Sequence, residues 1–181
     1  MAVVLRLSLS GGIYKVRMNY LEKLKKSGFI VTSREKSKEL PLDLIERYKN
    51  IPDDYLDFLQ QFTQITNKDN TVWFNSIEDY SGNTDAAFKW NEFESLSLEA
   101  FEGDEEETHN ITVYWDNHIP VIVSVKTYEY LAICLGADNY GKIVHGEEPE
   151  FEESSVVCSS FEELVDLLTN SAENHILNHF L

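Results

Sequence analysis

Alternation of hydrophobic and polar residues is the clearest pattern in this chain, and it predicts β-strands near the start and over the second half of the sequence. Residues 5–9 and 14–18 alternate on either side of Gly11-Gly12, which predicts an N-terminal β-hairpin with a two-residue turn. Further runs rich in β-branched and aromatic residues predict strands at Phe29–Thr32, Thr71–Phe74, Ile111–Trp115, Val121–Val125, Tyr130–Leu135 and Lys142–His145. The later runs are separated by short turns, so we expect them to form an antiparallel meander.

Helical periodicity accounts for much of the remaining sequence. A capping pair at Asn19 and Glu22 and a stop at Gly28 predict a short basic helix. The other predicted helices cover Pro41–Lys49, Pro52–Phe62, Phe93–Phe101 and the segment that follows Ser160.

Together these elements predict an α+β fold. We expect a single domain with an antiparallel sheet of about four to six strands flanked by helices, plus the N-terminal β-hairpin. Residues 1–39 form the hairpin and the short basic helix, packed on the body, and residues 40–181 form the main domain. With 43% hydrophobic and 12% aromatic residues, the chain has enough apolar side chains for a core.

Charge is divided unevenly along the chain. Residues 1–49 contain 11 Lys and Arg against 5 Asp and Glu, whereas the rest contains 4 against 27, for a net charge of −17. An acidic surface repels phosphate backbones and anionic headgroups and attracts basic partners. Nucleic acid and membrane are therefore excluded as expected partners, and we expect the basic N-terminal segment to pack against the acidic body and partly neutralise it.

Two features lead us to expect a cytoplasmic protein. The apolar start of the chain is interrupted by Arg6, Ser8 and Ser10 before a secretory or membrane-spanning segment could form. Cys134 and Cys158 lack metal-ligand spacing and lie in apolar runs, which predicts buried, reduced thiols.

No residue pattern predicts catalysis, a cofactor or a metal. His175 and His179 are four residues apart on an expected terminal helix, where they could share a zinc ion, but no third ligand lies near them in sequence. We therefore expect both to be solvated and unliganded. The sequence also lacks a nucleophile elbow, a phosphate loop and a dinucleotide fingerprint, so we expect no enzyme.

Acidic segments are the candidate binding residues. Glu102–Glu107 and Glu147–Glu153 are read as two solvated loops that could contact a partner. In a strand, Tyr114 and Trp115 would face opposite ways, so one of them could be an exposed aromatic anchor beside the first loop. The candidate partner-binding residues are Glu102, Asp104, Glu105, Glu106, Glu107, Trp115, Glu147, Glu148 and Glu150.

Several short motifs, in this order, resemble the SUKH superfamily, which joins a yeast cell-wall regulator to many bacterial immunity proteins. The motifs are Leu40-Pro41, Ile51–Leu59, His118–Val121, Tyr130–Ile133, Gly141–Val144 and Ser160–Leu164. The resemblance covers roughly residues 40–168. The chain departs from the family where Thr63–Asn67 replaces an Asn-Gly turn and where Lys126–Glu129 replaces a glycine-rich acidic turn.

Two functions follow from this resemblance. The first is a non-catalytic immunity protein that binds and neutralises a cognate toxin, expected to be basic and nuclease-like. The second is a regulatory adaptor or scaffold that binds a housekeeping protein. A toxin gene beside this one would favour the first, and an isolated gene would favour the second.

Overall fold

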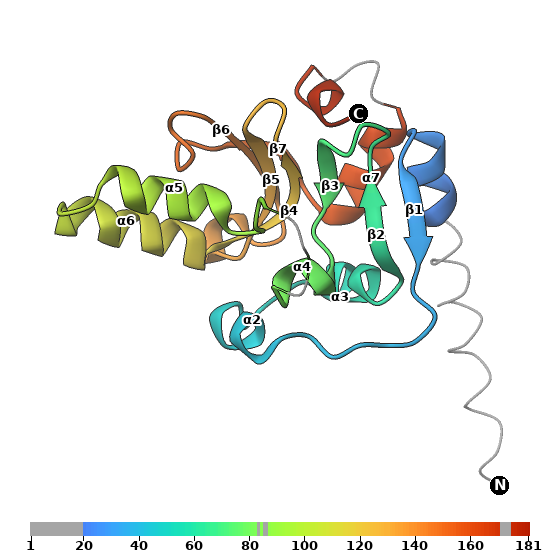
Figure 1. Cartoon of the computed structure of the whole chain (residues 1–181), viewed down its shortest axis with the longest axis horizontal. Helices are drawn as coiled ribbons and strands as arrows, with labels where there is room; N and C mark the ends of the chain where they lie inside the picture. Colours follow the sequence, from blue (N-terminus) through green and yellow to red (C-terminus); the bar gives the residue numbers. More distant parts are fainter. Residues whose placement is uncertain (1–19, 83, 85–86, 171–174) are drawn as a thin grey trace, which may run out of the picture.

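A computed structural model of the chain describes residues 20–82, 84, 87–170 and 175–181. The N-terminal hairpin expected over residues 5–18 lies outside these residues. The described part forms an α+β fold built on one open antiparallel sheet (Figure 1).

The sheet contains seven strands in sequence order, so that each strand pairs with the next one along the chain. More strands are present than the expected four to six, because β2 and β7 were not predicted. Phe62 continues the apolar spacing of the preceding helix, which concealed the start of β2, and the acidic segment before β7 suggested only a loop. The strands are β1 (Ile30–Ser33), β2 (Phe62–Thr66), β3 (Val72–Phe74), β4 (His118–Ser124), β5 (Glu129–Cys134), β6 (Ile143–Glu147) and β7 (Ser155–Cys158).

One face of the sheet carries the larger hydrophobic core. The helix over residues 20–26 places Tyr20 and Leu24 in this core, together with Ile77 and Tyr80 of α4 (Ile77–Tyr80) and side chains from four further helical elements. Ser160 begins the last α-helix as predicted, and its hydroxyl accepts a hydrogen bond from the Glu163 amide. The four elements are α2 (Leu42–Arg47), α3 (Asp53–Leu59), α7 (Phe161–Thr169) and the 3₁₀ helix η3 (Leu177–Phe180).

The opposite face is covered over β4–β6 by two helices, α5 (Glu92–Ala100) and α6 (Glu105–Asp116). Figure 1 shows them as an antiparallel pair that extends to one side of the sheet. Alternate residues of β5 serve the two cores, since Tyr130 and Ala132 face α5 and α6 while Leu131 and Ile133 face α3 and α7.

The prediction of a strand at Ile111–Trp115 was wrong, because this segment belongs to α6. Asp104 caps the helix by accepting hydrogen bonds from the amides of Glu106 and Glu107. Ile111 and Trp115 are one helical turn apart and pack on the sheet. The β-branched residues between them gave a local strand signal, which capping and tertiary packing override.

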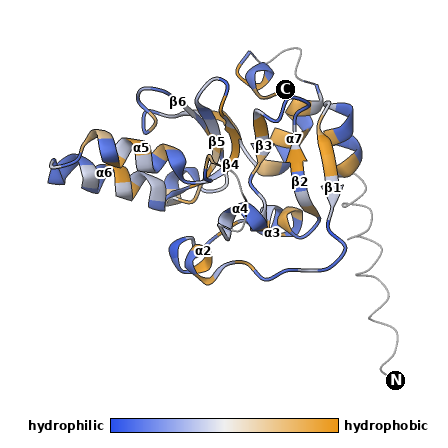
Figure 2. Cartoon of the chain, viewed as in Figure 1, coloured by the Kyte–Doolittle hydropathy of each residue, from blue (hydrophilic) through white to orange (hydrophobic). Residues whose placement is uncertain are grey.

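Two further short elements lie in the connections between strands. A capping box between Ser76 and Asp79 begins α4 (Ile77–Tyr80), and a 3₁₀ turn, η1 (Ala137–Asn139), lies between β5 and β6. Figure 2 shows hydrophobic residues concentrated in the strands of the sheet, and hydrophilic residues at the outer end of the α5–α6 pair.

Basic residues of the first 49 positions pair with acidic residues of the later chain. Arg47 binds Glu94 of α5 and Asp116 of α6, with contacts of 2.6 and 2.8 Å. Within the described residues, every ion pair made by a Lys or Arg joins these two parts of the chain. The pairs are Lys23–Asp166, Arg34–Glu78, Lys38–Glu78, Arg47–Glu94 and Arg47–Asp116.

Cys134 and Cys158 are buried and form no disulfide, as predicted. Burial raises the pKa of the Cys158 thiol to about 12, so the thiol stays protonated at neutral pH. Among the described residues, no helix is long and apolar enough to cross a lipid bilayer.

Candidate partner-binding groove

A groove of about 760 Å³ lies between the α5–α6 pair and the loop that connects β6 to β7. Glu107 of α6 lines it from one side, and Glu148, Glu150, Glu152 and Glu153 of the loop line it from the other. Acidic residues that are about forty positions apart in sequence therefore meet at one concave surface. We call this surface, with its lining residues, the acidic groove.

Two exposed aromatic side chains border the acidic groove. Phe101 follows α5 and is 45% exposed, and Tyr128 lies in the β4–β5 turn and is 41% exposed. Tyr128 has a φ of 54°, in the left-handed region that non-glycine residues rarely adopt. This backbone conformation is a local cost, and conformations of this type are found disproportionately at functional sites.

The floor of the groove is held in place by buried hydrogen bonds. The Trp115 indole Nε1 donates to Glu152 Oε1 at 2.7 Å, and the Tyr130 hydroxyl donates to the carbonyl of Phe151. The hydroxyls of Tyr114 and Tyr130 lie 2.7 Å apart. Burial raises the pKa of Tyr114 to about 12 and that of Tyr130 well above its ordinary value, so both phenols remain neutral. These bonds fix the β6–β7 loop against α6.

Trp115 is therefore not an exposed anchor. It is 1% exposed, because it points from α6 onto the sheet, and it supports the groove from beneath by holding Glu152. The exposed aromatic residues are instead Phe101, which the sequence assigned to the apolar side of a helix, and Tyr128. Nothing in the local pattern marked Phe101 as exposed, and Tyr128, which lies in the Lys126–Glu129 turn, was not singled out either.

The predicted acidic residues separate into three places. Glu107, Glu148 and Glu150 line the groove. The residues at the exposed turn where α5 ends and α6 begins are Glu102, Asp104, Glu105 and Glu106. Glu147 shares the face of β6 that carries His145, on the other side of the sheet from the groove. The segment Glu102–Glu107 is also not a loop throughout, because its last three residues form the first turn of α6.

The histidines take structural positions that the sequence showed only in part. His118 stacks on Tyr114, and its Nδ1 lies 2.8 Å from the Tyr114 carbonyl oxygen. Burial lowers the pKa of His118, which favours the neutral ring. His179 was expected to be solvated, but its Nδ1 lies 3.1 Å from both carboxylate oxygens of Glu129, which is buried. His175 is exposed, as expected.

Comparison with known proteins found no relative: no family model matches the chain, and the searches of curated proteins and of solved structures gave no match.

Proposed function

We propose that this chain is a non-catalytic immunity protein that binds a basic, nuclease-like toxin domain in the acidic groove and so neutralises it. The observation that carries this proposal is the meeting of Glu107 with Glu148, Glu150 and Glu153 around one groove. The exposed rings of Phe101 and Tyr128 border the same groove and can serve as anchors.

A basic protein segment fits the chemistry of this groove better than other ligands. Phosphate backbones are repelled by the carboxylates, whereas Lys and Arg side chains are attracted. Arg can also stack on the exposed faces of Phe101 and Tyr128 while pairing with a carboxylate. The groove is open and prearranged, because the Trp115–Glu152 hydrogen bond holds one wall before any partner arrives.

The resemblance of residues 40–168 to the SUKH superfamily supports the choice of a toxin as the partner. Blocking a toxin requires affinity and rapid association, and it requires no catalytic residues. A dense negative charge on the groove meets the second requirement, since electrostatic attraction can accelerate protein association by about 10- to 1,000-fold.

Charge reversal in the groove tests the proposal. The variant Glu107→Lys, Glu150→Lys, Glu153→Lys should slow association with the toxin domain by about tenfold or more at low ionic strength, and the difference should shrink as salt rises. Stopped-flow fluorescence or surface plasmon resonance at several salt concentrations measures this rate. Melting curves of both proteins confirm that the variant remains folded.

A matched control separates the groove from the overall charge. The variant Glu102→Lys, Glu105→Lys, Glu106→Lys changes the net charge equally, but its residues lie at the α5–α6 turn outside the groove. We expect a smaller loss of association rate from this variant. Equal losses from the two variants would remove the acidic groove as the binding surface.

Substitution of an anchor residue should instead change the dissociation rate of the complex. Tyr128→Asn removes the ring but retains a residue that tolerates the left-handed backbone of this turn. We expect the dissociation rate to rise by roughly tenfold with little change in association, because truncating a buried anchor costs binding free energy in the bound complex. An unchanged dissociation rate would exclude Tyr128 as an anchor.

Co-expression in living cells is the experiment that identifies the partner. The chain is co-expressed with the product of the adjacent gene in cells that this product alone kills, and the complex is then isolated. Rescue and co-purification support immunity. If the chain fails to rescue and instead recovers a housekeeping protein, the toxin proposal fails and the adaptor function replaces it.

A further inference from the structure

A buried carboxylate lies between two imidazoles on the face of the sheet opposite the acidic groove. Glu129 begins β5 and is 3% exposed. Its Oε2 lies 3.0 Å from His145 Nε2, and His179 approaches both of its oxygens from the C-terminal 3₁₀ helix. A buried carboxylate is costly unless charge and hydrogen bonds compensate it.

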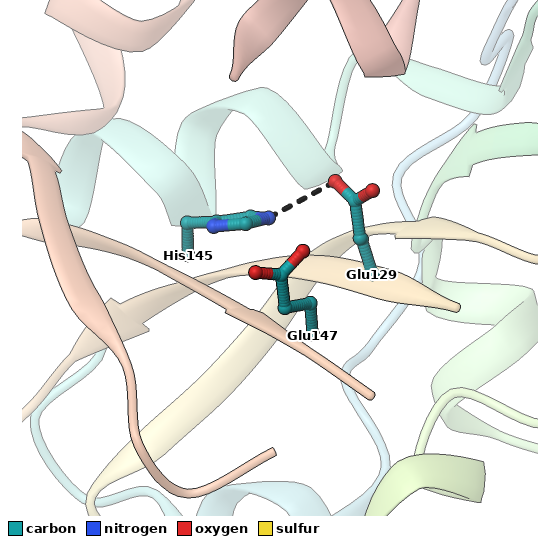
Figure 3. A group of neighbouring side chains, drawn as sticks. All are labelled: Glu129, His145 and Glu147. Atoms are coloured by element: carbon teal, nitrogen blue, oxygen red, sulfur yellow. Dashed lines mark hydrogen bonds and ion pairs between the residues drawn. The ribbon is translucent and has the colours of Figure 1, made fainter. Parts of the chain in front are cut away.

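A second carboxylate, that of Glu147, raises the free-energy cost of burying Glu129. Glu147 of β6 stands directly opposite Glu129 in the antiparallel register, and like charges at opposed positions destabilise a sheet. His145 is two residues before Glu147, so its side chain is on the same face. One ligand atom from each of Glu129, His145 and Glu147 lies within 4.8 Å of the others. Figure 3 shows the three side chains converging on this point.

We propose that Glu129, His145 and Glu147 bind a divalent transition-metal ion of the zinc class, with His179 closing the site from the C-terminal segment. A dipositive ion would neutralise the two opposed carboxylates. Imidazole nitrogen with carboxylate oxygen suits zinc, whereas calcium prefers six to eight oxygen ligands and magnesium an octahedral oxygen shell.

Along the Glu129–His145 edge the geometry already suits such an ion. Zinc bonds of about 2.0 to 2.1 Å place tetrahedral ligands about 3.3 Å apart, close to the 3.0 Å between Glu129 Oε2 and His145 Nε2. The ion would take the place of the hydrogen bond between these two atoms, with the ring proton carried on His145 Nδ1. Glu147 is exposed, so its side chain can rotate toward the ion without disturbing the core.

This site was not visible in the sequence because its ligands are brought together by strand register. His175 and His179 have a familiar spacing but no third ligand nearby in sequence, whereas Glu129, His145 and Glu147 are adjacent only after β5 pairs with β6. A bound ion would link both strands to η3, whose Leu177 and Phe180 are fully buried. Metal binding should therefore stabilise the attachment of the C-terminal segment.

Calorimetry with zinc chloride on the full chain, stripped of metal with a chelator, tests the proposal near pH 7.5. We expect one zinc ion per chain with a dissociation constant in the micromolar range or tighter, and a higher melting temperature with zinc than without it. Calcium and magnesium should not bind at the same concentrations.

Substitution of individual ligands tests where the zinc ion binds. Glu147→Gln and His179→Gln should each weaken zinc binding at least tenfold and abolish the gain in melting temperature. Glu147 is exposed, so its variant should fold normally. Two matched controls should bind zinc as the original chain does: His109→Gln, which changes an exposed histidine of α6, and the groove variant Glu107→Lys, Glu150→Lys, Glu153→Lys.

Three outcomes would overturn the site. The first is absence of zinc binding by the original chain. The second is unchanged zinc binding in Glu147→Gln, and the third is loss of binding in the groove variant, which would place the ion on the other face. Because zinc binding is measured without any protein partner, its failure would leave the proposed function untouched.

Discussion

Glu78 is the carboxylate at which two basic residues of the N-terminal part of the chain meet. Arg34 binds it with both terminal nitrogens, at 2.9 and 2.7 Å, and Lys38 Nζ lies 3.2 Å from Oε1. The hydrogen bonds from Arg34 are the main reason that the pKa of Glu78 falls from 4.5 to about 2. Paired charges with this geometry hold the segment before α2 against α4.

The lowered pKa gives this pair a defined pH dependence. Because the folded-state pKa lies below the ordinary one, the stabilisation is complete above about pH 4.5 and is lost as the pH falls toward 2. Glu78→Gln should lower the free energy of unfolding at pH 7 by about 1 to 2 kcal/mol, a range reduced for partial solvent screening. Urea denaturation measures this loss at each pH.

The loss should shrink steadily as the pH falls from about 4.5 to about 2. Glu46→Gln, which removes a charge from an exposed position of α2, is the matched control and should change the free energy of unfolding little at any pH. A loss in Glu78→Gln that stays constant across this range would contradict the assigned role of the Arg34 pair.

At the scale of elements, α6 forms one wall of the groove and positions the opposite wall. Asp104 caps it, Ile111 and Trp115 attach it to the sheet, and Trp115 also holds Glu152 in the β6–β7 loop. Trp115→Phe keeps most of the packing but removes the indole donor. We expect a loss of about 1 to 2 kcal/mol of unfolding free energy and faster amide hydrogen exchange in residues 148–154.

Trp73→Phe, at a half-buried position of β3, is the comparison for the Trp115 variant. It removes an indole from the same face of the sheet and should leave exchange in the β6–β7 loop unchanged. Exchange that is equally slow in both variants would mean that the Trp115–Glu152 bond does not hold the loop.

The same helix shows where sequence reasoning succeeds and fails. The central strands and α7 were predicted because alternation, capping and helical spacing are local signals. Ile111–Trp115 was wrong because its β-branched residues were weighed without the cap at Asp104 and the acidic first turn. The acidic segments were identified from composition. Which of their residues share a groove depends on helix and strand packing, and that information is not local.

At the scale of the whole molecule, charge is partly balanced within the fold. Arg47 bridges α2 to both helices of the α5–α6 pair, and Lys23 pairs with Asp166 of α7. These contacts join Lys23 and Arg47 to acidic residues of the later chain. The five acidic residues that line the groove take part in none of these ion pairs.

Removing these cations should leave the repulsion among the acidic side chains uncompensated and so lower the stability of the fold. The variant Lys23→Gln, Lys38→Gln, Arg47→Gln should melt roughly 3 to 6 °C lower than the original chain at low salt, and the difference should decrease as salt screens the charges. The control Lys25→Gln, Lys26→Gln, Lys36→Gln removes the same charge from exposed positions. Equal shifts in the two variants, measured by calorimetry, would show that net charge matters and the specific pairs do not.

The sequential order of the strands also has a consequence for how the protein forms during synthesis. Each strand can pair with its predecessor as soon as it leaves the ribosome, because neighbouring strands of the sheet follow one another along the chain. The larger core is different, because α7 and η3 are made last and cover apolar side chains of strands that are already complete. A nascent chain that stalls before residue 159 would hold an assembled sheet on which the apolar side chains that α7 and η3 cover are still exposed to water. At this late step chaperones would be needed most.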